Sequence, residues 1–118
     1  MNILMNKTYV AGAAIPANSI VKFGADDNTV IVATAVGDAS IGVSLGFAAA
    51  TDQRIDVLHF GLADVKLGVG GITRGAEVTS DASGQGVAAA ATNRVVGVAF
   101  GGGVAGDIVP VMISLATK

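Results

Sequence analysis

A glycine-rich loop at residues 101–106 is the first stretch whose residue types could bind a ligand. Gly101-Gly102-Gly103-Val104-Ala105-Gly106 matches the dinucleotide-binding pattern G-x-G-x-x-G and follows an apolar run typical of a strand. Such a loop holds phosphate where a helix begins at it, because the helix N-terminus supplies amide donors and a positive dipole. Here Asp107 and Pro110 follow instead, and the proline would break a helix after its first turn. We therefore predict a turn between strands and no phosphate site.

The single histidine, His59, is the second candidate for chemistry. A general base or a metal ligand needs partners, and Asp56 lies three residues away, on the opposite face of a strand. Asp26-Asp27-Asn28 could suggest calcium, but it lacks the alternating spacing and the distant Glu of a calcium loop. The chain has no Cys. We predict no enzyme activity, no catalytic residue, no cofactor and no metal, and a surface or interface role for His59.

Composition favours tightly packed β structure and a partner chain. The chain has 118 residues, which suggests one domain; 52% of them are apolar, 4% aromatic and 14% charged, and 17 are glycine. The charged share is far below the roughly 25% of an ordinary globular domain, so we expect another chain to cover part of the surface. The net charge is −2, with no basic block. Binding to nucleic acid is therefore not expected. The longest apolar runs are too short for a membrane span or a signal peptide, so neither is expected.

Strand-like segments and turns alternate along the chain. Short runs of alternating or β-branched residues are separated by turn clusters at intervals typical of a sandwich or barrel. The predicted strands are residues 19–23, 29–34, 40–45, 54–60, 75–80, 94–100 and 108–114. Pro110 should take an edge, bulge or unpaired position. Alanine runs at residues 48–50 and 88–91 allow at most a short helical turn each.

The two halves of the chain resemble one another. The aligned pairs are Ile15–Val21 with Ile72–Val78, Ile41–Val43 with Val96–Val98, and Ala49–Asp52 with Val104–Asp107. Two copies of one β unit explain this pattern. We predict an all-β barrel or sandwich built from two related halves, approximately residues 10–61 and 65–115. Together they form one domain over residues 10–118, which follows an N-terminal arm of residues 1–9.

The order of these motifs resembles the capsid decoration, or cement, proteins of tailed bacteriophages, of the small β-barrel type. The motifs are the start Val10-Ala11-Gly12-Ala13-Ala14-Ile15, the segments Ile41-Gly42-Val43 and Val96-Gly97-Val98-Ala99, an alanine-rich link and a small-residue turn with Asp. The resemblance implies a virion protein, made in the bacterial host cytoplasm, that binds the capsid exterior. It further implies the major capsid protein and the protein itself, as a homotrimer, as partners.

The residues themselves leave other functions open. Another phage structural β protein, such as a tail-tube or fibre component, is the first alternative, and a small ligand-binding or enzymatic barrel is the second. Residues 1–9 fit an arm that orders on docking as well as a frayed terminus. The candidate interface residues are Ile3, Leu4, Met5 and Tyr9 in this arm, with Arg54 and His59 on a strand.

Overall fold

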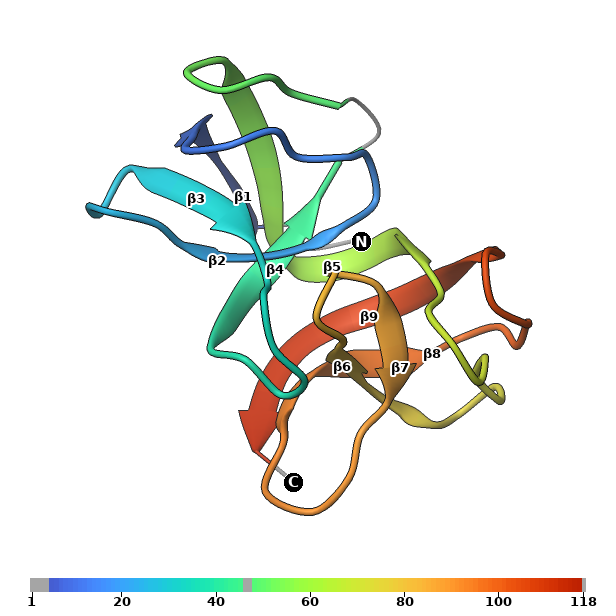
Figure 1. Ribbon diagram of the computed structural model, residues 1–118. Helices are drawn as coiled ribbons and strands as arrows, with labels where there is room; N and C mark the ends of the chain where they lie inside the picture. Colours follow the sequence, from blue (N-terminus) through green and yellow to red (C-terminus); the bar gives the residue numbers. More distant parts are fainter. Residues whose placement is uncertain (1–4, 46–47, 118) are drawn as a thin grey trace.

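The computed structural model describes residues 5–45 and 48–117, with side chains placed for residues 6–45 and 48–114. Over these residues the chain has nine strands and no helix, as the all-β prediction requires. The strands are β1 (Met5–Ala11), β2 (Ile20–Phe23), β3 (Thr29–Val32), β4 (Ser40–Ser44), β5 (Arg54–Lys66), β6 (Glu77–Ser80), β7 (Gly86–Ala88), β8 (Arg94–Ala99) and β9 (Ile108–Thr117). Figure 1 shows them as two groups that share β5.

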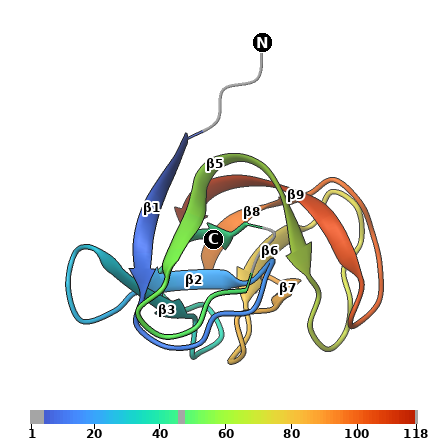
Figure 2. The same ribbon diagram turned by 90° about the horizontal axis from the view of Figure 1, so that it is seen from above.

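Strand β5 joins two small barrels. The order β1-β3-β2-β4-β5, closed by pairing of β1 with β5, forms the first barrel. The order β5-β9-β8-β6-β7 forms the second, and a parallel bridge between Leu67, just past β5, and Gly86 completes its ring. Figure 2 shows β5 curving from its place beside β1 to its place beside β9. The change of partner falls at Gly61, whose φ of 128° suits a residue without a side chain.

The register of the strands repeats from one barrel to the other. Strands β1 and β5 pair from Asn6–Leu58 to Val10–Arg54. The same register recurs between β5 and β9, from Leu62–Met112 to Lys66–Ile108. Strands β4 and β5 pair as β8 and β9 do, because Val43–Leu58 corresponds to Val98–Met112. β5 is therefore both the closing strand of the first barrel and the opening strand of the second.

Apolar side chains form two clusters. One fills the first barrel and contains Tyr9, Ala11, Ile15, Val21, Val30, Ala49, Ile55 and Val57. The other fills the second barrel and extends to the first, with Ile20, Ala33, Val43, Leu58, Ala63, Val65, Leu67, Ile72, Val78, Val96, Ala99, Val109, Val111 and Ile113. Leu58 and Val57 are neighbours in β5 but lie in different clusters, because alternate side chains point to opposite faces of a strand. One face of the first barrel is thus covered by the second barrel.

Glycines at equivalent places allow close strand contact. A methyl group on Gly42 would overlap the carbonyl oxygen of Leu58, and one on Gly97 would overlap that of Met112. Both glycines lie next to a register shift, in the pairing of β2 with β4 for Gly42 and in the pairing of β8 with β9 for Gly97. The glycine shared by the segments at residues 41–43 and 96–98 is therefore required by contact between backbones.

The structure corrects several predictions about the strands. The register shift puts Ile41 against the first cluster and Val43 in the other, although simple alternation predicts one face for both. Ala88 ends β7 and Ala49 forms a bridge to Ile15, so neither described alanine run is helical. Strands β1 and β7 and the second part of β5 were not predicted, because β1 is largely polar and β7 has three residues.

The prediction of an arm over residues 1–9 is wrong from Met5 onward. Residues Met5–Tyr9 belong to β1, which pairs with β5 and closes the first barrel. The Tyr9 side chain is buried in the core of that barrel, and this packing explains the strand. Ile3 and Leu4 lie outside the described residues.

Pro110 lies inside β9, opposite Asp64 of β5. Its carbonyl oxygen accepts a hydrogen bond of 2.8 Å from the N–H of Phe100, one residue beyond the end of β8. In a strand the N–H and C=O of one residue point to the same side. The donor that proline lacks would therefore face Phe100, one residue beyond the end of β8. The prediction of an edge, bulge or unpaired position is wrong, because Pro110 pairs with Asp64 in a strand that lies between β5 and β8; the missing bond falls where the pairing of β8 with β9 ends.

Candidate functional site

The glycine-rich loop at residues 101–106 uses its amides within the chain. The N–H of Gly103 donates to Ile72 O at 3.0 Å, and the N–H of Gly106 donates to Leu67 O at 3.0 Å. Val104 N–H donates to Oδ2 of Asp107 at 3.0 Å. Strand β9 follows at once, so no helix N-terminus faces the loop. These amides close the second barrel and do not form a phosphate cradle.

The corresponding turn in the first barrel shows what this loop requires. Ala50 N–H donates to the Gln53 side chain at 2.8 Å, as Val104 does to Asp107. The alignment of Asp52 with Asp107 is therefore wrong by one residue. Asp52, with φ of 71°, takes the place of Gly106, with φ of 90°. Both turns therefore need a residue with left-handed backbone angles. The next residue must carry a side-chain oxygen that accepts a hydrogen bond from the backbone N–H three residues before it.

His59 bonds to groups of its own barrel. Its Nδ1 lies 2.7 Å from Ile41 O and its Nε2 lies 2.7 Å from the Tyr9 hydroxyl. A carbonyl oxygen only accepts, so in the neutral ring Nδ1 carries the proton and Tyr9 O–H donates to Nε2. Lys7 Nζ lies 5.1 Å from the centre of the Tyr9 ring, and the Phe23 ring meets Tyr9 edge-on at 6.1 Å. Burial raises the pKa of the Tyr9 hydroxyl.

The acidic turns are held by local hydrogen bonds. Asp26 accepts from Asn28 N–H at 3.0 Å, which is the geometry of a hairpin turn and lowers the pKa of Asp26. Asp38 pairs with Lys22 at 2.8 Å and accepts from Thr34 N–H at 2.9 Å. The Lys22 ammonium holds the pKa of Asp38 well below its usual range. Within residues 5–45 and 48–117, no group of three or more His, Cys, Asp or Glu residues could hold a metal ion.

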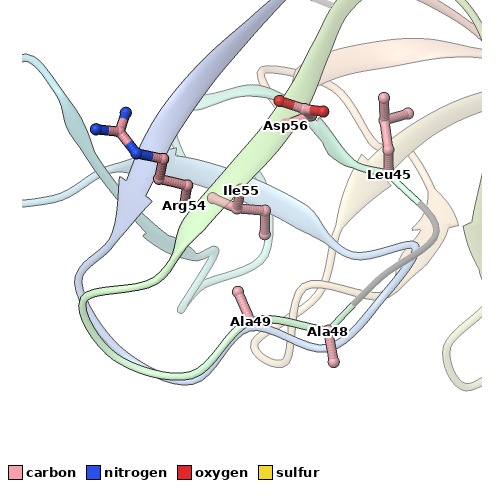
Figure 3. Close-up of a pocket in the computed structure, with 6 residues that line it drawn as sticks. All are labelled: Leu45, Ala48, Ala49, Arg54, Ile55 and Asp56. Atoms are coloured by element: carbon pink, nitrogen blue, oxygen red, sulfur yellow. The ribbon is translucent and has the colours of Figure 1, made fainter.

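A shallow pocket of about 310 Å³ lies at the edge of the first barrel, lined by Leu45, Ala48, Ala49, Arg54, Ile55 and Asp56 (Figure 3). In Figure 3 the Arg54 side chain extends away from Leu45. Asp56 accepts a hydrogen bond of 2.6 Å from the Thr8 hydroxyl. The polar lining is thus one arginine and one carboxylate that already has a partner, with no nucleophile or base beside them. This lining does not assemble a catalytic group.

A second feature is an apolar surface on the second barrel. We call it the outer apolar face; it consists of Leu62, Val98, Phe100, Ile108, Pro110 and Met112. Leu62 of β5 and Val98 of β8 pair with Met112 of β9 from opposite sides, so the three side chains are neighbours. The exposed fractions of Leu62, Phe100 and Ile108 are 50%, 53% and 55%. Apolar side chains gathered across three strands are typical of an interaction surface.

This surface was missed in the sequence, although a signal was present. Strand β9 reads Ile108-Val109-Pro110-Val111-Met112-Ile113, with apolar residues on both faces. Val109, Val111 and Ile113 fill the second barrel, which leaves the alternate residues outside. A strand without polar residues on either face predicts cover on both sides.

Two of the predicted interface residues, Tyr9 and His59, contact each other, but the set does not form one exposed surface. Arg54 is exposed beside the pocket, His59 is half-buried and Tyr9 is buried. Tyr9 therefore acts within the barrel core rather than as an exposed anchor. Met5 pairs with Phe60 at the start of β1. Over the described part of the chain, no helix is long and apolar enough to cross a membrane.

The fold and these surfaces define a class: an all-β protein of two fused small barrels with an exposed apolar surface on the second. No protein-family model matches the chain, and no curated protein matches it. Five solved chains match, one of which is described as head fiber gp8.5 N base in bacteriophage phi29. It superposes with a TM-score of 0.73 at 18% sequence identity, over 98% of both chains. At this identity the likeness establishes a shared fold.

Proposed function

We propose that this chain is a structural protein of a bacteriophage head, placed on the outside of the capsid and acting without catalysis. The observation that carries the proposal is the likeness to the head fiber N base along 98% of both chains. The sequence resemblance to capsid decoration proteins suggests the same location. A shared fold hosts many functions, so the surfaces of this chain must support the role as well.

The surfaces of the chain favour protein partners. The outer apolar face offers a desolvated contact, while the charged share of the sequence is 14% and the net charge is −2. We propose the major capsid protein and further copies of this chain, as a homotrimer, as the partners. Joining several weak contacts in one oligomer raises affinity for a repetitive shell through effective concentration. We expect no binding to nucleic acid or membranes and no cofactor.

Two forms of this role differ in what the chain does for the shell. A decoration protein bridges neighbouring capsid subunits, and its contacts stabilise the shell against disruption. The base of a fibre anchors a projecting element and leaves the stability of the shell unchanged. The resemblance in sequence motifs favours decoration, whereas the name of the structural neighbour favours the fibre base.

Phage heads that lack the protein provide the test. Purified protein should sediment with such heads at saturating, symmetric copy number. A higher temperature of head disruption would identify decoration, and binding without this rise would identify a fibre base. Arg54→Ala should weaken binding if this exposed residue contacts the shell, with the exposed Arg74→Ala as the matched control. Absence of binding to heads at any stage of maturation would refute the proposal.

A further inference from the structure

The internal repeat indicates what could cover the outer apolar face. The strand pair Ile20–Val43 of the first barrel corresponds to Glu77–Val98 of the second, and Val43–Leu58 corresponds to Val98–Met112. The first-barrel equivalents of Glu77, Val98, Phe100 and Met112 are therefore, in the same order, Ile20, Val43, Leu45 and Leu58. Ile20, Val43 and Leu58 are buried in the cluster that extends from the second barrel, and Leu45 packs against it. Three residues of the outer apolar face, Val98, Phe100 and Met112, are therefore at least partly exposed at positions that are covered in the first barrel. The other three, Leu62, Ile108 and Pro110, correspond to Asn6, Arg54 and Asp56, which are exposed in the first barrel as well.

The cover on the first barrel is one end of the second barrel. That end consists of Ala63, Ser80, Val96 and Ile113, all buried. Ala63, Val96 and Ile113 belong to the same cluster as Val43 and Leu58, and β4 contacts both β8 and β9. The Ser80 hydroxyl donates to Ala35 O of the first barrel at 3.0 Å, and Gly37 N–H donates to Ser80 O at 3.2 Å. The internal interface thus joins the end of one barrel to the outer face of the other.

The corresponding end of the first barrel has no such cover among the described residues. By strand register its residues are Lys7, Phe23, Ile41 and His59, in the places of Ala63, Ser80, Val96 and Ile113. Lys7 is exposed, and the exposed fraction of Phe23 is 48%. We call these four residues the first-barrel end. The chain therefore has one internal interface and leaves one copy of each of its two surfaces open.

We propose that copies of this chain associate head to tail, with the first-barrel end of one copy on the outer apolar face of the next. The contact would repeat the interface that already joins the two barrels within one chain. It deepens the self-association proposed above by naming the two surfaces. An interface between different surfaces closes into a ring when its rotation permits, which is compatible with a trimer.

The first-barrel end carries Lys7, and charges of both signs, Asp64, Glu77 and Lys66, lie at the border of the outer apolar face. Electrostatic complementarity favours an orientation in which Lys7 lies near Asp64 and Glu77 rather than near Lys66.

The experiment uses one variant for each surface. Val98→Glu places a charge in the outer apolar face, and Phe23→Glu places one in the first-barrel end; both native side chains are partly exposed. Val69→Glu is the matched control, since Val69 is 88% exposed in the loop after β5 and belongs to neither surface. Sedimentation velocity measures the size of each protein alone and in mixtures. Far-UV circular dichroism melts confirm that each variant is folded before its size is interpreted.

We expect the native protein and the Val69→Glu control to form the same oligomer. Each surface variant alone should dissociate at concentrations roughly a hundredfold higher than the native protein, because burying an unpaired charge is costly. An equimolar mixture of the two surface variants should form a one-to-one dimer, because each supplies the surface that the other lacks. A monomeric native protein, unchanged folded variants, or a mixture that stays monomeric would overturn the proposal. Association that survives both variants would retain self-association but reject these surfaces, and capsid binding is measured separately.

Discussion

Replacing Gly97 or Gly42 by alanine tests whether close backbone contact fixes the two barrels. A methyl group on Gly97 would overlap Met112 O and lie 2.8 Å from the Met112 carbonyl carbon, and backbone cannot rotate away as a side chain can. Strand β8 must then move from β9, which weakens the pairs Gly97–Ile113 and Val98–Met112. Two weakened hydrogen bonds at about 1 kcal/mol each, with strain of roughly 1–3 kcal/mol, give a loss of roughly 3–5 kcal/mol.

Urea unfolding followed by far-UV circular dichroism measures this loss, since the chain has no Trp for fluorescence. Gly42→Ala should cost a similar amount, because Leu58 O occupies the place of Met112 O. Gly101→Ala is the control: its nearest new contact is the Pro110 ring at 3.2 Å, and it should change stability by less than about 1 kcal/mol. A loss below about 1 kcal/mol for both Gly42→Ala and Gly97→Ala would refute the reasoning.

Three further predictions follow from single contacts. Tyr9, the only tyrosine, should ionise above the usual tyrosine pKa of about 10 in an absorbance titration of the folded protein. Because the pKa of Tyr9 is raised in the folded state, the free energy of unfolding should fall as pH rises through that range. Ionisation at the usual pKa in folded protein would contradict this. Asp38→Asn should lower the free energy of unfolding by about 1 kcal/mol at neutral pH. Because the pKa of Asp38 is lowered in the folded state, the native protein should lose this advantage over the variant as pH falls below about 4. Urea midpoints with the same pH dependence in both proteins would contradict this. Deleting residues 1–9 should unfold the first barrel, as measured by thermal melts. Deleting residues 1–4 is the control, since it leaves the pairs of β1 with β5 in place. A first barrel that stays folded without residues 5–9 would show that β1 is dispensable.

Local sequence patterns predicted much of the fold. Ile55 and Val57 alternate with Asp56, and the structure buries the first two while Asp56 bonds to Thr8 at the surface. Turn residues marked the ends of the strands, because a residue such as Gly106 or Asp52 must adopt positive φ there. What local patterns did not predict was β1, whose polar residues form a strand because β5 offers it a partner.

The candidate surface depended on information that no single strand contains. Leu62, Val98 and Met112 lie 14 to 50 residues apart in the chain, and only the pairing of three strands makes them neighbours. The interface residues predicted from type alone, Arg54 and His59, lie in the part of β5 that belongs to the first barrel.

By itself the sequence determined an all-β protein of two related halves, because strand period, turn residues and repetition are local properties. It also determined that the loop at residues 101–106 is a turn, since Asp107 and Pro110 exclude a helix there. Only the tertiary structure decided that β5 serves both barrels and that Val43 and Leu58 are buried while the equivalent Val98 and Met112 stay partly exposed. The physical reason is that burial depends on which distant segment packs against a face, and the two halves have different neighbours although their strands pair alike.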